Sequence, residues 1–159
     1  MPFFVATAKF GDLIEFSYPI GYSHWGVNDR DGYVIHFAVS GEDNIEYNAY
    51  ALPSGDLLLG VTKVCSMLIK DVTVPTGASI RINNHHDFDA SSPEDMRRCL
   101  NALLGQDFSY HLLNLNCEHF ATFVRYGKAV CNQVDGNHRQ CLFMLRYQQK
   151  QQQSHLFKL

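Results

Sequence analysis

Cys117 is the residue of this sequence that most favours nucleophilic chemistry. It lies in the segment Asn114-Leu115-Asn116-Cys117-Glu118-His119-Phe120, where apolar spacing predicts a helix that begins near Asn116 and ends before Gly127. The first turn of a helix has unpaired N–H groups and about half a positive charge, which stabilise a thiolate. We therefore expect the pKa of Cys117 to fall below the value of about 8.5 for a free thiol, with Asn114 or Asn116 as the N-cap.

The other cysteines lack this combination of a helix start and capping residues. Five cysteines at wide, irregular spacing disfavour a disulfide framework, and the absence of a C-x-x-C motif disfavours a structural zinc site. We expect the remaining four to be ordinary small hydrophobic residues, which is also the alternative interpretation of Cys117. These four are Cys65, Cys99, Cys131 and Cys141.

A nucleophilic cysteine needs a base and a group that orients the base, and His24 and His36 are the candidates. Both lie in runs rich in aromatic and β-branched residues, 23–27 and 33–39, which predict two strands of a hairpin. Alternation puts each histidine on the less bulky side of its strand. We expect the other histidines to be structural or to lie in polar or terminal contexts: His85, His86, His111, His119, His138 and His155.

The register of this hairpin decides whether the two histidines share a face. With a three-residue loop at 30–32, His36 lies opposite Gly26 and His24 opposite Ala38, so both histidines share one face with their backbones roughly 7–8 Å apart. A two-residue turn at 31–32 would put them on opposite faces. We favour the first register, because a left-handed glycine at the third loop position suits a bulged turn.

Other local signals outline an α+β domain. Ser92 and Pro93 predict the N-cap and first residue of a helix that ends near Gly105. Further strands are expected at 13–16, 67–69 and 78–83, and a long irregular loop is expected at 40–60.

The composition indicates one compact intracellular domain. With 159 residues, 46% of them hydrophobic, the chain can bury about 70% of its unfolded surface in one core. The net charge of −3 does not provide the basic surface of a nucleic-acid-binding protein. No apolar run approaches the roughly 20 residues that span a bilayer, and the N-terminus lacks the basic region of a secretory signal. We therefore expect a cytoplasmic, monomeric protein.

Six segments together resemble the lecithin:retinol acyltransferase-like family, and most closely its small phospholipase A and acyltransferase members, the HRAS-like suppressor proteins. They extend in the same order and at similar spacings over residues 10–134. The segments are Gly11–Phe16, Gly21–Val27, Asp31–His36, Arg81–Asn84, Asn116–Phe120 and Arg125–Lys128.

The resemblance implies a permuted papain-like, NlpC/P60-related α+β fold, in which an antiparallel sheet packs against helices. It also implies a catalytic triad with Cys117 as nucleophile, His24 as base and His36 as the orienting group. The implied reaction forms a thioester from an ester of a glycerophospholipid and passes the acyl group to water, a lysophospholipid or the amine of phosphatidylethanolamine. Oxyanion or substrate contacts are expected from the backbone N–H of Cys117, from Tyr22 and from Asn116, and neither metal nor cofactor is expected.

The C-terminal segment departs from the family, many of whose members carry a hydrophobic anchor of membrane-spanning length. Here the apolar run 141–145 has five residues, and Arg146, Lys150 and a glutamine-rich stretch at 148–153 follow it. Such a run cannot span a bilayer, but it can rest at an interface beside basic residues. We expect a catalytic domain over 1–134 and a polar tail without a transmembrane anchor over 135–159. Transient association with membrane surfaces would give access to glycerophospholipids and lysophospholipids.

Two alternatives remain open. A non-catalytic interaction or regulatory module with the same fold is one, since the 2A proteins of some small RNA viruses carry related His-box and Asn-Cys segments. A cysteine protease is the other, because a Cys-His-His arrangement alone does not distinguish peptide from lipid substrates. The reactivity of Cys117 relative to the other cysteines separates an enzyme from a module.

Overall fold

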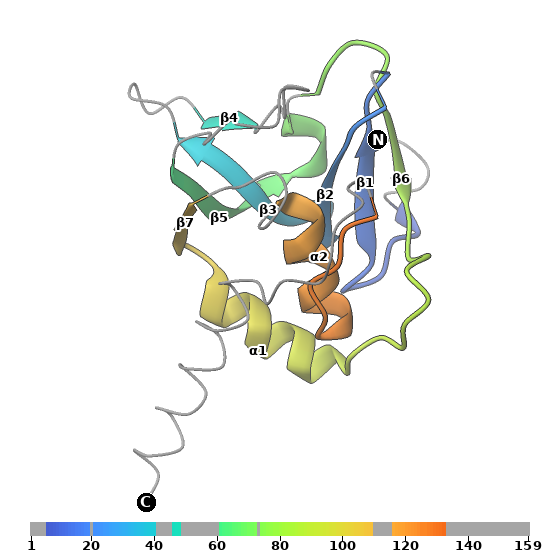
Figure 1. Cartoon of the computed structure of the whole chain (residues 1–159), viewed down its shortest axis with the longest axis vertical. Coiled ribbons are helices and arrows are strands. Elements are labelled where there is room, and N and C mark those ends of the chain that lie inside the picture. The colour runs from blue at the N-terminus through green and yellow to red at the C-terminus, as the bar shows by residue number, and fades with distance from the viewer. Residues whose placement is uncertain are drawn as a thin grey trace, which may run out of the picture.

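The computed structural model describes residues 6–19, 21–40, 46–48, 61–72, 74–109 and 116–132. Within these ranges seven strands form one antiparallel sheet in the order β6-β1-β2-β3-β5-β7, and β4 also pairs with β3 (Figure 1). The strands are β1 (Leu13–Ser17), β2 (Ser23–Asn28), β3 (Tyr33–Ser40), β4 (Glu46–Asn48), β5 (Val61–Leu68), β6 (Ser79–Ile82) and β7 (Asp107–Ser109). Two α-helices accompany this sheet, so the predicted α+β class is confirmed.

Both helices begin and end at the predicted signals. Helix α1 (Pro93–Leu103) is capped by Ser92, whose hydroxyl accepts the backbone N–H of Asp95 at 3.1 Å. Helix α2 (Cys117–Tyr126) is capped by Asn116 and ends at Gly127, which has a left-handed φ of 67°. Figure 1 shows α2 lying over the sheet, where it contacts β1, β2 and β3.

Alternation along the strands produces two apolar layers. The helix-side core contains alternate sheet residues together with the apolar faces of α1 and α2, and Cys117 belongs to it. Its sheet members are Leu13, Trp25, Val27, Ile35, Phe37 and Val64. The outer core on the other face of the sheet contains Ile14, Phe16, Tyr18, Val34, Ile69 and Val72.

The β2–β3 hairpin has the register that puts both histidines on one face. Gly26 pairs with His36, as predicted for the favoured alternative. The outcome follows from side-chain alternation, because a shift by one residue would have moved one histidine to the opposite face.

The turn of this hairpin differs in detail from the expected three-residue loop. Asp31 and Gly32 both have positive φ, 54° and 80°. The N–H of Tyr33 donates to the carbonyl of Arg30, while the N–H of Asp29 donates to the carbonyl of Tyr33, both at 2.9 Å. Asp29 and Arg30 therefore both lie opposite Tyr33, which makes a β-bulge. The bulge adds one residue to β2's side, so the turn has two residues and the strands still have the favoured register.

The two strands diverge beyond the Gly26–His36 pair. Within the described residues 23–40, the predicted pairing of His24 with Ala38 does not form. His24 pairs with Phe16 of β1, whereas Ala38 pairs with Lys63 of β5. Ala38 also pairs with Asn48 of β4, so β4 takes the place of β2 beside β3 where the two strands diverge at the level of His24.

Three other expectations are corrected. Ile69 belongs to the 3₁₀ helix Ile69–Asp71 rather than to a strand, and β4 forms inside the region 40–60 that was expected to be loop. Strand β7 was not predicted; it is held by pairing with β5, a non-local contact without a local signal. The tail expected at 135–159 lies outside the described residues. Among the helices that the structure describes, none has the length and apolar character needed to cross a membrane.

Candidate active site

The thiol of Cys117 is fixed by the cap of the helix that it begins. Cys117 is the first residue of α2 and is fully buried. The side-chain oxygen of Asn116 accepts the N–H groups of Glu118 at 3.0 Å and His119 at 3.1 Å. In return Nδ1 of His119 accepts the N–H of Asn116 at 3.2 Å, which completes a capping box. His119 is thus structural, as predicted.

The sulfur contacts the two residues that directly precede His24. Its Sγ lies 3.4 Å from the hydroxyl oxygen of Tyr22 and 3.9 Å from the carbonyl oxygen of Ser23. Ser23 is the first residue of β2, at the end of the strand where β2 and β3 diverge. The N-terminus of α2 therefore meets the sheet at the level of His24. The His24 ring, however, packs against Phe16 of the outer core, whereas Cys117 belongs to the helix-side core, and Nδ1 of His24 makes no hydrogen bond with the thiol.

His24 and His36 contact each other directly. Nε2 of His24 lies 2.9 Å from Nδ1 of His36, and the two rings meet edge to face at 82°. Both side chains are fully buried, and the ring of Phe16 packs 5.6 Å from that of His24. Nδ1 of His24 is buried without a hydrogen-bond partner within the described part of the chain.

Burial keeps both imidazoles neutral at neutral pH. It lowers the pKa of His24 well below 6.5, and the neighbouring His36 lowers it further. Burial also lowers the pKa of His36 to about 4, although a backbone hydrogen bond with Phe37 opposes the shift. A neutral imidazole has a bare nitrogen, so the resting His24 is free to accept a proton, although its lowered pKa makes it a weaker base.

A buried carboxylate anchors the strand residue that touches the thiol. The hydroxyl of Ser23 donates to Oε1 of Glu15 at 2.7 Å. Arg81 and Asn83 donate to Oε2 of the same carboxylate at 2.7 Å and 2.6 Å. Burial raises the pKa of Glu15, but these hydrogen bonds and the charge of Arg81 lower it more, so the net shift is downward.

A second buried carboxylate supports the start of α2. Glu118 is fully buried; Nε2 of His86 donates to its Oε1 at 3.0 Å, and the thiol of Cys131 donates to its Oε2 at 3.1 Å. The side-chain amide of Asn116 donates to the sulfur of Cys131 at 3.2 Å. Sequence reasoning missed these roles of His86 and Cys131, because the partners lie far apart along the chain and leave no local pattern.

The two other cysteines of the described residues, Cys65 and Cys99, differ in their surroundings, and Cys141 lies outside the described residues. Cys99 is a core residue as predicted, and burial raises the pKa of its thiol to about 12. Cys65, by contrast, lies 3.8 Å from Nε2 of His36 through its sulfur, a contact that the sequence did not suggest. Within the described residues no cluster of His, Cys, Asp and Glu is suited to hold a metal ion.

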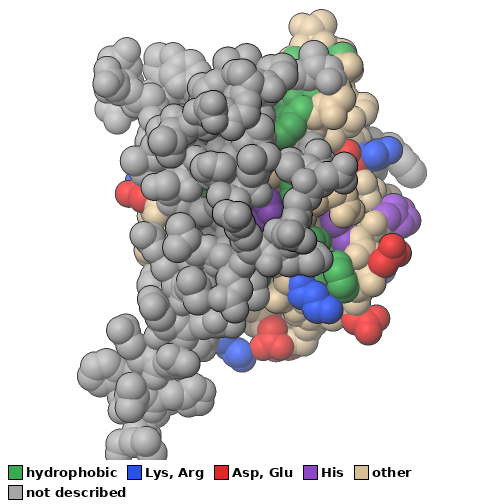
Figure 2. Space-filling model, viewed as in Figure 1, with side chains coloured by type: hydrophobic (Ala, Val, Ile, Leu, Met, Phe, Trp, Pro, Cys, Tyr) green, Lys and Arg blue, Asp and Glu red, His purple; other side chains and the backbone are tan. Residues whose placement is uncertain are grey.

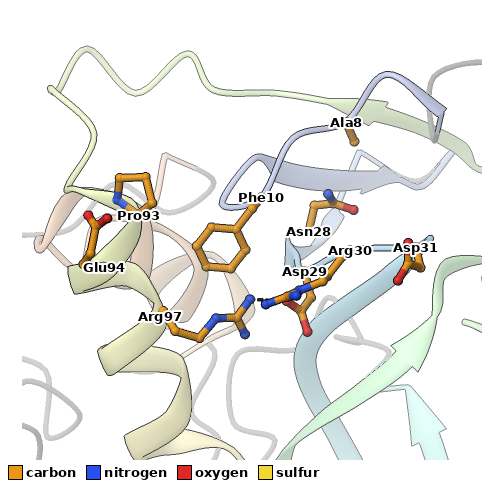
Figure 3. A pocket seen from close by; sticks show the side chains of 9 residues that line it. All are labelled: Ala8, Phe10, Asn28, Asp29, Arg30, Asp31, Pro93, Glu94 and Arg97. Atoms are coloured by element: carbon orange, nitrogen blue, oxygen red, sulfur yellow. Dashed lines mark hydrogen bonds and ion pairs between the residues drawn. The ribbon is translucent and has the colours of Figure 1, made fainter.

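One surface cleft of the described residues lies apart from this site. A cleft of about 520 Å³ is lined by the β2–β3 turn and the start of α1 (Figure 3). In it Arg97 stacks on Phe10 at 4.3 Å and pairs with Asp29, so its walls are already joined by ion pairs and ring contacts. On the face shown in Figure 2, coloured acidic and basic side chains are interspersed rather than gathered by sign.

Comparison with known proteins identifies the family of the chain. The family model described as lecithin retinol acyltransferase matches residues 6–130, a span that contains Cys117, His24 and His36. The chain belongs to this family. Among curated members, human phospholipase A and acyltransferase 4 is 35% identical over 129 residues, covering 80% of this chain and 75% of that protein. Human phospholipase A and acyltransferase 1 is 37% identical over 128 residues, covering 79% and 71%.

Proposed function

We propose that the protein is a thiol-dependent phospholipase A1/A2 and acyltransferase that takes an acyl chain from a glycerophospholipid. Its family and the names of its relatives support the general activity. The observation that carries the proposal is the placement of the Cys117 thiol at a helix N-terminus, against the residues that precede a buried, neutral His24.

In the first half-reaction Cys117 attacks the acyl carbonyl carbon of the phospholipid ester. Nδ1 of His24 takes the thiol proton as the S–C bond forms, and Nε2–H of His24 donates to His36, which orients the ring and stabilises the imidazolium. The tetrahedral intermediate collapses by breaking the ester C–O bond. The lysophospholipid oxygen takes the proton from His24 and leaves, and the acyl group stays on sulfur as a thioester.

In the second half-reaction an acceptor attacks the thioester. Water, a lysophospholipid hydroxyl or the amine of phosphatidylethanolamine gives its proton to His24 and bonds to the acyl carbon. The C–S bond then breaks, and the sulfur takes the proton back from His24. Every proton moves between groups already named, so no step requires a metal or a cofactor.

The oxyanion of each tetrahedral intermediate needs nearby donors. We assign the backbone N–H of Cys117 and the hydroxyl of Tyr22, which is within 3.4 Å of the sulfur. Asn116 contributes in this proposal through the helix terminus that its side chain caps, which holds the donor at Cys117 in place.

Trapping the thioester tests the proposal. The full chain is mixed with phosphatidylcholine vesicles, quenched in acid and digested, and the peptide that contains Cys117 is weighed. We expect one acyl group on Cys117 that neutral hydroxylamine removes, and no thioester or lysophosphatidylcholine from Cys117→Ser. The Cys141→Ser variant controls for the loss of a thiol as such. Full turnover by Cys117→Ser would overturn the proposal, and absence of acylation in a folded wild-type chain would favour a non-catalytic module.

The choice of acceptor is tested with mixed vesicles of phosphatidylcholine and phosphatidylethanolamine. Mass spectrometry of the lipids separates free fatty acid, reacylated lysophospholipid and N-acyl phosphatidylethanolamine. An acyltransferase produces the second or third of these in a Cys117-dependent manner, whereas a pure phospholipase produces only the first.

A further inference from the structure

Cys65 of β5 lies beside the histidine to which His24 is bonded. It is the direct cross-strand partner of His36, and its sulfur is 3.8 Å from Nε2 of that ring. Directly opposed residues of an antiparallel pair point to the same face. The strand register itself therefore holds the sulfur against the imidazole.

The three side chains form a continuous chain across β2, β3 and β5. Two neutral imidazoles joined by one hydrogen bond have two proton arrangements. In the first, Nε2–H of His24 donates to Nδ1 of His36, so His36 carries its own proton on Nε2, which faces Cys65. In the second, Nδ1–H of His36 donates to Nε2 of His24, and His24 then carries its proton on Nδ1.

Only the first arrangement leaves His24 able to act as a base at Nδ1. The second would leave a buried N–H at that atom, which has no partner among the described residues. Among backbone groups, orphaned buried N–H groups are rarer than under-satisfied acceptors, and we apply the same preference to the imidazole nitrogen. A sulfur that accepts Nε2–H of His36 completes the first arrangement, in addition to the backbone hydrogen bond that His36 makes with Phe37.

We infer that Cys65 is a positioning residue: its sulfur accepts the Nε2–H of His36 and thereby holds His24 in the tautomer that can take a proton from Cys117. The inference rests on the proposed function, because it assigns the tautomer that the reaction needs. Cys65 itself touches neither the thiol nor the acyl group in this account; it acts through two rings.

Steady-state kinetics on a short-chain phosphatidylcholine test this role. Cys65→Ala removes the acceptor, and we expect kcat to fall about fivefold to tenfold with KM unchanged, the effect of one weak hydrogen bond on the barrier. Cys65→Ser restores an acceptor of similar size and should keep kcat within about twofold of the wild type. Ser66→Ala is the matched control, because Ser66 is the next residue of β5, is exposed and points to the opposite face.

A direct readout comes from the imidazole ¹⁵N shifts of His36 in the full chain. We expect protonated Nε2 and bare Nδ1 in the wild type and in Cys65→Ser, and a mixture of both tautomers in Cys65→Ala. A wild-type kcat for Cys65→Ala, or equal losses in the Ala and Ser variants, would overturn the inference, as would a wild-type His36 protonated on Nδ1. Failure of the proposed function has a different signature, since Cys117→Ser would then be active whatever residue occupies position 65.

Discussion

Gly26 lies directly opposite His36 in the antiparallel pairing of β2 and β3. A Cβ at Gly26 would lie 3.2 Å from Cβ of His36 and 3.1 Å from the carbonyl oxygen of Ile35, and it would clash more severely with a methyl group of Val34. The missing side chain is what allows β2 to approach β3 this closely at the last pair before the strands diverge. The contact between the two imidazoles therefore depends on a residue that has no functional group.

Gly26→Ala should impair both folding and catalysis. The added methyl group overpacks a buried strand pair, which costs about 1–3 kcal/mol in the free energy of unfolding. It also pushes β3 and His36 away from His24, so kcat should fall further than the lost stability explains. Urea unfolding and phosphatidylcholine hydrolysis measure the two effects.

Gly105→Ala is the control for this substitution. Gly105 has a φ of 78° and open space around the position of a Cβ, so alanine there costs about 1–2 kcal/mol through backbone strain alone. It should keep the activity of its folded fraction. If both glycine variants have equal kcat, Gly26 does not determine the placement of His36.

Replacing the two histidines should have unequal effects. His24→Ala removes the group that takes the thiol proton, and we expect kcat to fall about 10²–10⁴-fold. His36→Gln should be milder, because the side-chain carbonyl of glutamine can still accept the Nε2–H of His24. The rate of lysophosphatidylcholine release measures both. Equal and total loss in the two variants would mean that base and orienting group are assigned the wrong way round.

The pH dependence of kcat/KM reports the protonation of His24 in the free enzyme. The burial of the ring and the adjacent His36 lower its pKa well below 6.5, so the neutral, active form persists as the pH falls through 6.5. We expect kcat/KM to stay level there and to decline only in more acidic buffer. Measurements from about pH 8 to pH 4 on a short-chain lipid, with circular dichroism to monitor folding, check this. An acidic limb centred above 6.5 in a folded protein would contradict it.

Local signals predicted the local parts of this site, and the non-local parts lay beyond them. Asn116 and Gly127 delimit α2 through capping geometry, which depends on a few neighbouring residues. The contact of Cys65 with His36 depends instead on a strand pairing between residues far apart in sequence, and the sequence around either residue contains no signal that predicts it. The same holds for the divergence of β2 from β3 at His24, where β4 pairs with β3 in place of β2.

The role of the site residues came from a different source than their placement. Side-chain alternation predicted that His24 and His36 share a face, and the structure confirms the register. It did not predict a direct hydrogen bond between the rings, because reach across a diagonal depends on how the strands splay. The roles of base and orienting group were implied by family resemblance and remain proposals.

Protonation of Glu15 should make the free energy of unfolding fall as the pH becomes acidic. Its native pKa is lowered below 4.5, so the carboxylate stabilises the fold fully above about pH 4.5, and this contribution is lost as the pH falls through the native value. Glu15→Gln should reduce stability at pH 7 and make its decline in acid shallower. Urea unfolding at several pH values measures this, with Glu94→Gln, an exposed glutamate, as control. If the free energies of unfolding of wild type and Glu15→Gln fell in parallel with decreasing pH, protonation of Glu15 would not contribute to acid destabilisation.

Two adjacent histidines should differ sharply in their contribution to stability. His86 is buried, donates to Oε1 of Glu118 at 3.0 Å and packs edge to face on Trp25, whereas His85 is exposed. His86→Ala removes a partner of a buried carboxylate and leaves a cavity, so we expect a loss of about 3 kcal/mol in the free energy of unfolding. His85→Ala should change it by no more than about 0.5 kcal/mol, as is usual for exposed positions. Urea denaturation measures the free energy of unfolding of both variants. Similar losses in the two would show that the bonds from Cys131 and the backbone of Asn132 are enough to hold the Glu118 carboxylate.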